Sequence, residues 1–158
     1  MNKRKIIIAW ILNITWIVMI FLLSNQPAVT SDQLSLGLLH RILMIVGIDS
    51  VSHLAFLNFL IRKFAHFSAY LILGVLMTNT LVVTFNLKSH IYFMMALILC
   101  GIYAASDEFH QLFVIGRSCQ VSDVLLDIFG SLVGIGIFFI IRKIIVSHNM
   151  HKNKENIN

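Results

Sequence analysis

Four polar residues interrupt an otherwise apolar stretch at residues 91–115: Asp107, Glu108, His110 and Gln111. Carboxylates and imidazoles can take up and release protons, and histidine does so near neutral pH. Ionisable groups at membrane depth cost at least about 2.5 kcal/mol each on insertion scales. We therefore predict that a chain that places several ionisable groups together uses them for its function.

Two further apolar stretches carry polar residues at helical spacing. The residues are Arg62, Lys63, His66 and Tyr70 in the first, and Asp123, Asp127 and Ser131 in the second. Residues three or four apart lie on one side of a helix. Lipid cannot satisfy such groups, so the stripes are predicted to face one another or a water-filled cavity. We therefore predict one polar pocket built by three helices.

Two kinds of chemistry are available in such a pocket. Arg62, Lys63 and Arg117 can hold an anion, arginine through a bidentate fork. Tyr70 and Gln111 complete the candidate substrate-binding set. The candidate catalytic residues are His66, Asp107, Glu108, His110, Asp123 and Asp127. Histidines with carboxylates can also hold a divalent metal. No spacing here matches a signature such as H-E-x-x-H, and we expect no metal or other cofactor.

A purely structural role also fits these residues. Arg62 and Lys63 can mark the end of a span and reach toward lipid head groups. His66 can serve as a structural hydrogen-bonding residue. Asp127 can pair with Arg62 or Arg117 and lock the bundle. The functional interpretation is favoured because the three stripes place many ionisable groups at one depth on one side of the membrane, which is unusual.

Composition indicates a small integral membrane protein. Of its 158 residues, 58% are hydrophobic and only 12% are charged, against about 25% charged in soluble domains. One proline and eight glycines exclude a disordered or fibrous chain. The net charge of +5 does not predict a nucleic-acid partner, because the basic residues sit at the ends of apolar stretches. Cys100 and Cys119 are expected at different depths, so no disulfide is expected.

The predicted fold is an all-α bundle of four transmembrane helices with an amphipathic interfacial helix between the first and second. A bilayer core is about 30 Å thick, and the stretches that can cross it are residues 6–23, 64–85, 91–107 and 124–141. The first could be a cleaved signal peptide, but its apolar run exceeds the usual core of one and no clear A-x-A site follows. We expect it to be retained. Residues 1–147 form the predicted membrane domain, and the polar tail 148–158 is expected to be disordered.

The segment 31–61 is too apolar for a free loop. Leu34, Leu38 and Ile42 recur at helical spacing, which predicts a helix lying in the outer interface. The candidate boundaries are Thr30, Ser31 or Asp32 at the start, and Gly47 and Asp49 at the end. The residues that follow would lead into the second span as the same helix. A fifth, short span is the alternative.

The distribution of basic residues predicts the orientation. With the N-terminus in the cytoplasm, eight of the 12 basic residues lie inside. These are Lys3, Arg4, Lys5, Lys88, Arg142, Lys143, Lys152 and Lys154. The positive-inside rule therefore favours both termini in the cytoplasm. The polar pocket then opens to the exterior, where most of the acidic residues also lie.

Gly130 and Gly134 form a G-x-x-x-G motif on the fourth span. Small residues at this spacing let helix backbones approach closely. The motif can bring Asp127 near the other polar stripes within one chain. The alternative is a homodimer contact through this face.

The motifs together resemble the VanZ-like family of small bacterial membrane proteins, named for an accessory protein of glycopeptide resistance. The resemblance runs from the first span to the end of the fourth. It is carried by Ser24-Asn25-Gln26, Arg62-Lys63-Phe64-Ala65-His66-Phe67 with Tyr70, Ser106-Asp107-Glu108-Phe109-His110-Gln111, Gly116-Arg117, and Asp123, Asp127 and Gly130. Two residues depart from the family pattern: Ile115 replaces a frequent proline, and Asp127 a frequent asparagine. The resemblance implies a bacterial cell-envelope location and a link to teicoplanin resistance, but no particular reaction.

Two functions follow as hypotheses. In the first, the outer pocket binds an anionic lipid or lipid-linked cell-wall precursor without turnover. In the second, the chain is an integral membrane enzyme that acts on a lipid-linked envelope substrate through histidine and carboxylate acid–base chemistry. Membrane lipids are the expected partners in both.

Overall fold

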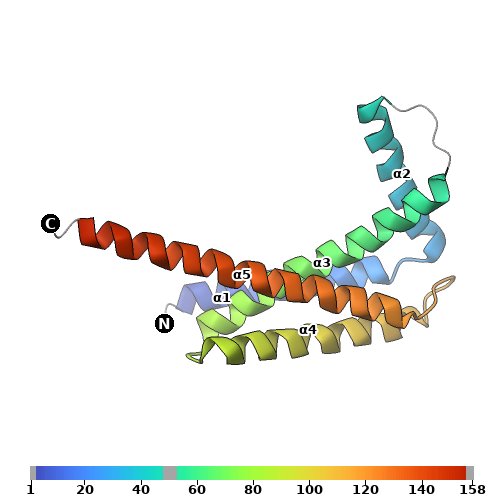
Figure 1. Cartoon of the computed structure of the whole chain (residues 1–158). Coiled ribbons are helices and arrows are strands. Elements are labelled where there is room, and N and C mark those ends of the chain that lie inside the picture. Colours follow the sequence, from blue (N-terminus) through green and yellow to red (C-terminus); the bar gives the residue numbers. More distant parts are fainter. Residues whose placement is uncertain (1–2, 48–52, 156–158) are drawn as a thin grey trace.

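The computed structural model describes residues 3–47 and 53–155, and all regular structure in them is helical (Figure 1). The helices are α1 (Lys3–Ser24), α2 (Ala28–Val46), α3 (Leu54–Thr84), α4 (Ser89–Gln111) and α5 (Val121–Glu155). α1, α3, α4 and the part of α5 up to His148 are long and apolar enough to cross a membrane. The predicted all-α membrane class is confirmed. Asp49, a candidate end of the interfacial helix, lies outside the described residues.

α3 is the centre of the bundle and packs against each of the other four helices. Its buried side chains include Tyr70, Leu73, Met77 and Leu81, which recur at three- and four-residue steps and so lie on one face. On α4 the small buried residues Ala96, Cys100 and Ala104 recur every fourth position. Small side chains let the α4 backbone come close to its neighbours.

The α3–α5 contact is so close that only glycine fits. A Cβ added at Gly134 would lie 2.0 Å from the Leu71 carbonyl oxygen, and one at Gly130 would lie 2.5 Å from that of Phe67. Gly74 on α3 faces the Ser131 carbonyl in the same way, at 2.4 Å. The face that we considered for a homodimer is therefore filled by α3 of the same chain. The glycine motif instead brings α5 and its carboxylates against α3.

α1 is attached to the bundle by hydrogen bonds from side chains to backbone. The Trp16 indole donates to the Ala69 carbonyl of α3 at 2.9 Å, and the Tyr103 hydroxyl of α4 donates to the Ile17 carbonyl at 2.8 Å. The remaining surface of α1 is largely exposed and apolar, as expected for a helix that faces lipid. These contacts fix the position of α1 along the bundle axis and hence the position of its last turn.

α2 is the predicted interfacial helix, but it begins earlier than the predicted caps. Pro27 precedes its first residue, Ala28, and a proline is well placed at a helix start because it has no N–H to satisfy. The Ala28 N–H donates to the Ile115 carbonyl at 3.1 Å, which ties the start of α2 to the α4–α5 loop. Gly47 ends the helix with a φ of 75°, a left-handed conformation suited to glycine.

Several helices run beyond the predicted spans. α3 begins at Leu54, so the residues before the second span do belong to the same helix. α5 projects beyond the other helices at its C-terminal end (Figure 1) and stays helical to Glu155, through most of the tail that we expected to be disordered. No proline or glycine follows Gly136, and extending a helix costs far less than starting one.

The connection between α3 and α4 is tight, as the sequence predicts. It occupies residues 85–88. The Tyr92 hydroxyl accepts from the Leu87 N–H at 2.7 Å and donates to the Phe85 carbonyl at 2.9 Å. One buried side chain thus holds both sides of the turn.

Candidate functional site

One end of the bundle gathers polar side chains from all five helices. The end of α1, the start of α2, the first half of α3, the end of α4 and the start of α5 meet there, together with the loop 112–120. The three stripes predicted from sequence are thus brought to one end. The last turn of α1 and the first turns of α2 take part as well, which the three-helix prediction did not include.

Three ion pairs cross this end. Arg62 Nη1 lies 2.7 Å from Asp32 Oδ1, and the Lys63 ammonium pairs with the Asp123 carboxylate. His66 Nδ1 lies 3.7 Å from Asp127 Oδ1. The sequence interpretation in which Asp127 pairs with Arg62 or Arg117 is therefore wrong. The first turns of α2 lie beside α3, so that Asp32 is within reach of Arg62.

Asp107, near the end of α4, is buried against the last turn of α1. Ser24, the last residue of α1, donates its hydroxyl to Asp107 Oδ2 at 2.8 Å. Gln111, one turn further along α4, donates to the same oxygen at 3.4 Å. The other carboxylate oxygen of Asp107 has no hydrogen bond of normal geometry in the described chain, although the Tyr70 hydroxyl lies beside this carboxylate. Ser24 and Asp107 together join the ends of two membrane-spanning helices.

Glu108 is held against the loop that leads into α5. It is 1% exposed, and its Oε1 accepts from the Gln120 backbone N–H at 2.6 Å. Electrostatic interactions connect it with Asp123, His66 and Asp127. Glu108 therefore anchors the loop and adds negative charge to the region around His66.

Several buried oxygen atoms at this end have no hydrogen-bond partner among the described residues. They are the Tyr70 hydroxyl, Asp107 Oδ1, Glu108 Oε2 and both carboxylate oxygens of Asp127. A buried polar group without a partner costs about 1–3 kcal/mol. So many of them close together indicate that water, protons or a ligand complete the site.

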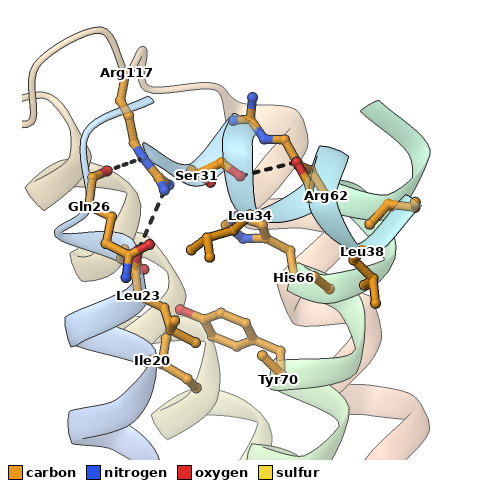
Figure 2. A pocket seen from close by; sticks show the side chains of 15 residues that line it. Ile20, Leu23, Gln26, Ser31, Leu34, Leu38, Arg62, His66, Tyr70 and Arg117 are labelled. Carbon is orange, nitrogen blue, oxygen red and sulfur yellow. Dashed lines mark hydrogen bonds between the residues drawn. The ribbon is translucent and has the colours of Figure 1, made fainter. Parts of the chain in front are cut away.

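Arg117 holds the centre of this end together (Figure 2). Its guanidinium donates to the Gln26 carbonyl at 3.1 Å and the Leu23 carbonyl at 3.5 Å. It also donates to Gln111 Oε1 at 3.0 Å. No carboxylate of the described chain lies within ion-pair distance of it. Burial lowers the pKa of Arg117, and the nearby Arg62 acts in the same direction. Arginine nevertheless stays charged at neutral pH, so Arg117 presents a positive charge that has no direct ion pair in the described chain and only longer-range interactions with Asp107, Glu108 and Asp32.

Two cavities meet at Arg62, His66 and Arg117. The first has a volume of about 240 Å³ and lies among α1, α2 and α3 (Figure 2). Most of its walls are apolar. The second, also of about 240 Å³, has polar walls. Those walls come from α2, α3, the end of α4, the α4–α5 loop and the first turn of α5 and include Lys63, Gln111 and Asp123, with the three shared residues.

The structure places the predicted site residues in three groups. Arg62, Lys63, His66, Tyr70, Gln111, Arg117 and Asp123 line the cavities. Asp107, Glu108 and Asp127 are buried and line neither cavity. His110 lies apart, with its ring 4.8 Å from that of Phe21 and its Nε2 3.2 Å from Asn25 Oδ1. The two histidines are therefore not brought together.

Sequence reasoning missed Asp32, Ser24 and the Gln120 backbone as parts of this end. Asp32 was considered as a helix cap and as one of the acidic residues on the outer side, but not as a site residue. Ser24 directly follows an apolar span at the same depth as the polar stripes, and this position could have indicated its role. No pattern in the sequence indicated the backbone donor at Gln120.

The carboxylates pair individually with different partners. Within the described ranges 3–47 and 53–155, no three histidine, cysteine, aspartate or glutamate side chains are arranged to share a metal ion. What the arrangement offers is an arginine for anion binding and a histidine–carboxylate pair for proton transfer.

The fold and this end define a multi-pass membrane protein with a cationic and carboxylate-rich site at one end of its bundle. A family model described as VanZ/LLP1 matches residues 9–142. The chain belongs to the VanZ/LLP1 family. No match was found among curated proteins or among solved structures.

Proposed function

We propose that this chain is a bacterial cell-envelope protein that binds the anionic head group of a lipid or lipid-linked precursor at the outer end of its bundle. The observation that carries the proposal is Arg117, whose guanidinium has no carboxylate of the described chain within ion-pair distance. It stands where both cavities meet. A guanidinium can bind a phosphate or carboxylate in bidentate fashion.

Two further cations can join Arg117. The Arg62 and Asp32 side chains are 36% and 43% exposed, and an exposed ion pair contributes only about 0–1 kcal/mol. A phosphate can therefore replace Asp32 on Arg62 at little cost. Lys63 lines the same polar cavity. The excess of basic residues at the opposite end favours an orientation with this site outside and both termini in the cytoplasm.

Membership of the VanZ/LLP1 family supports the envelope assignment. The VanZ-like resemblance links such proteins to teicoplanin resistance. An anionic lipid-linked wall precursor would connect the site with that phenotype. We propose this connection for the chain, and susceptibility of cells that express it provides the cellular readout.

Binding of head groups to purified protein tests the proposal. The protein in detergent is titrated with phosphatidic acid and with phosphatidylcholine of the same acyl chains. We expect at least tenfold preference for the anionic lipid. Arg117→Gln should remove most of that preference and Arg62→Gln part of it. Arg41→Gln, an exposed charge on α2 that lines neither cavity, is the matched control. Equal affinity for the two lipids, or equal losses in the Arg117 and Arg41 variants, would overturn the proposal.

The second candidate function is an enzyme, and the pairing of His66 with Asp127 favours it. The buried Asp127 carboxylate lies beside a half-buried imidazole that lines both cavities. A carboxylate can orient a histidine that acts as general acid or base. Arg117 would then stabilise developing negative charge on the substrate.

Replacement of the two histidines separates turnover from binding. Enzyme chemistry predicts that His66→Ala abolishes the effect of the chain on teicoplanin susceptibility while its membrane level is unchanged. His110→Ala, which lies away from both cavities, should have little effect. A small, graded loss in His66→Ala, with a larger loss in Arg117→Ala, would support binding without turnover.

A further inference from the structure

We infer that the ligand is an amphiphile with a single hydrocarbon chain that ends in a phosphate-class anion, with its chain in the apolar cavity among α1, α2 and α3. This inference rests on the proposed function, because it extends head-group binding at Arg117 to a second subsite. Neither cavity alone reaches the range of about 300–1,000 Å³ usual for small-molecule sites, whereas the two together do.

The rim of the apolar cavity indicates that it opens to lipid. Leu23, Leu34 and Leu38 line it and are 47%, 57% and 51% exposed. α2 packs chiefly on α3, which leaves these leucines of α1 and α2 without a covering helix. Half-exposed leucines are costly beside water but not beside hydrocarbon. A chain from the bilayer can therefore enter here and complete their burial.

The order of the two cavities along the bundle matches an amphiphile. The apolar cavity lies at the last turn of α1 and at residues 65–70 of α3 (Figure 2). The polar cavity includes Gly116, Ser118 and Gln120 of the α4–α5 loop, beyond the end of α4. Charged walls thus stand at the end of the bundle and apolar walls deeper within it. A lipid in the same leaflet has this polarity.

The junction offers groups for the link between head and chain. Arg62, His66 and Arg117 line both cavities. Tyr70 is 1% exposed and lines the apolar cavity, and its hydroxyl lies beside the Asp107 carboxylate without a hydrogen bond of normal geometry in the described chain. In Figure 2 this hydroxyl is directed into the space below Arg117. It is placed to donate to an oxygen where a hydrocarbon chain joins its anionic head.

The experiment compares butyl phosphate with octyl phosphate on the full chain in lipid nanodiscs, by titration calorimetry. Each methylene moved from water into an apolar site strengthens binding about fourfold. We expect octyl phosphate to bind at least tenfold more tightly than butyl phosphate. Ala65→Trp should fill the cavity and remove this gain while butyl phosphate binding is retained. Leu38→Trp, at an exposed position on the opposite wall, should do the same.

Phe64→Trp is the matched control, because Phe64 is 70% exposed and lines neither cavity. This variant should keep the full gain in affinity from butyl phosphate to octyl phosphate. It also corrects for partition of octyl phosphate into the lipid of the nanodisc. Butyl phosphate binding without any gain for octyl phosphate would overturn the inference and leave head-group binding intact. A gain that persists in both cavity-filling variants would place the chain in the surrounding lipid and also overturn it. Failure of both phosphates would overturn the proposed function itself.

Discussion

Asp107, Glu108 and Asp127 are all buried, yet they are satisfied to different degrees. Asp107 receives hydrogen bonds from two side chains, and Glu108 receives one from a backbone N–H. Asp127 receives none in the described chain, and the basic group within 4 Å of it there is His66, at 3.7 Å. A buried carboxylate without donors is costly unless it is neutralised. The three carboxylates are therefore expected to respond differently to substitution.

Asp127→Asn should preserve the fold and raise thermal stability. The change keeps the size of the side chain and replaces a buried carboxylate that lacks donors by a neutral amide, which costs less to bury. The measurement is the unfolding temperature in detergent. A decrease of several degrees would mean that the charge is well compensated by His66, contrary to this expectation. Asparagine is also frequent at this position in the VanZ-like pattern.

Ser24→Ala should destabilise the chain by about 1–3 kcal/mol, because it leaves Asp107 Oδ2 with only the long hydrogen bond from Gln111. Chemical denaturation in mixed micelles measures the loss. Ser106→Ala is the control, since Ser106 is exposed on α4. Equal stability of the two variants would show that the Ser24 hydrogen bond contributes nothing.

The contact between α3 and α5 decides whether the polar stripes can meet at all. Gly130 and Gly134 remove the side chains that would separate the two helices. Asp127 lies one turn before Gly130 and faces His66 across this contact. A small widening of the interface would therefore separate the histidine from its carboxylate.

Gly134→Ala should destabilise the bundle strongly, since its Cβ would lie 2.0 Å from the Leu71 carbonyl oxygen. Gly136→Ala is a control on the same helix. It meets nothing within 4 Å and should stabilise α5 by about 0.5–1 kcal/mol through helix propensity. Thermal unfolding and the yield of folded protein in membranes check both. Similar behaviour of the two variants would contradict the close contact.

The helices were predictable where the hydropathy pattern and the spacing of polar residues are clear. Apolar runs gave the four spans, and steps of three or four residues gave the polar faces. The pairings were not predictable in the same way, because they depend on how each helix is rotated about its axis. Arg62 pairs with Asp32 because α2 lies beside α3, and nothing in the order of residues specifies that approach. His110 directly precedes Gln111, which lines the polar cavity, yet its ring contacts Phe21 and Asn25 and lines neither cavity.

At the scale of the whole molecule, the site has a function outside the cell only if the bundle has the orientation that its basic residues predict. Cys119 gives a direct test, because it is exposed in the α4–α5 loop beside the polar cavity, whereas Cys100 is buried. The natural chain thus carries one exposed thiol, and it lies at the end of the bundle that holds the candidate site.

A membrane-impermeant maleimide should label Cys119 in intact cells, and the Cys119→Ser variant should remain unlabelled. Labelling only after the membrane is permeabilised would place the site in the cytoplasm and contradict the proposed orientation. The reagent's access is confirmed by labelling of a cysteine introduced at Ser118, which is exposed in the same loop.

The short link that Tyr92 holds between α3 and α4 has a consequence for biogenesis. With only residues 85–88 between them, these two helices cannot enter the bilayer independently and must insert as a hairpin. In the proposed orientation, Asp107 and Glu108, at the far end of α4, would be translocated together with Arg62 and Lys63 of α3. Acidic and basic side chains would then cross the hydrocarbon together, although their ion-pair partners in the folded chain lie on other helices.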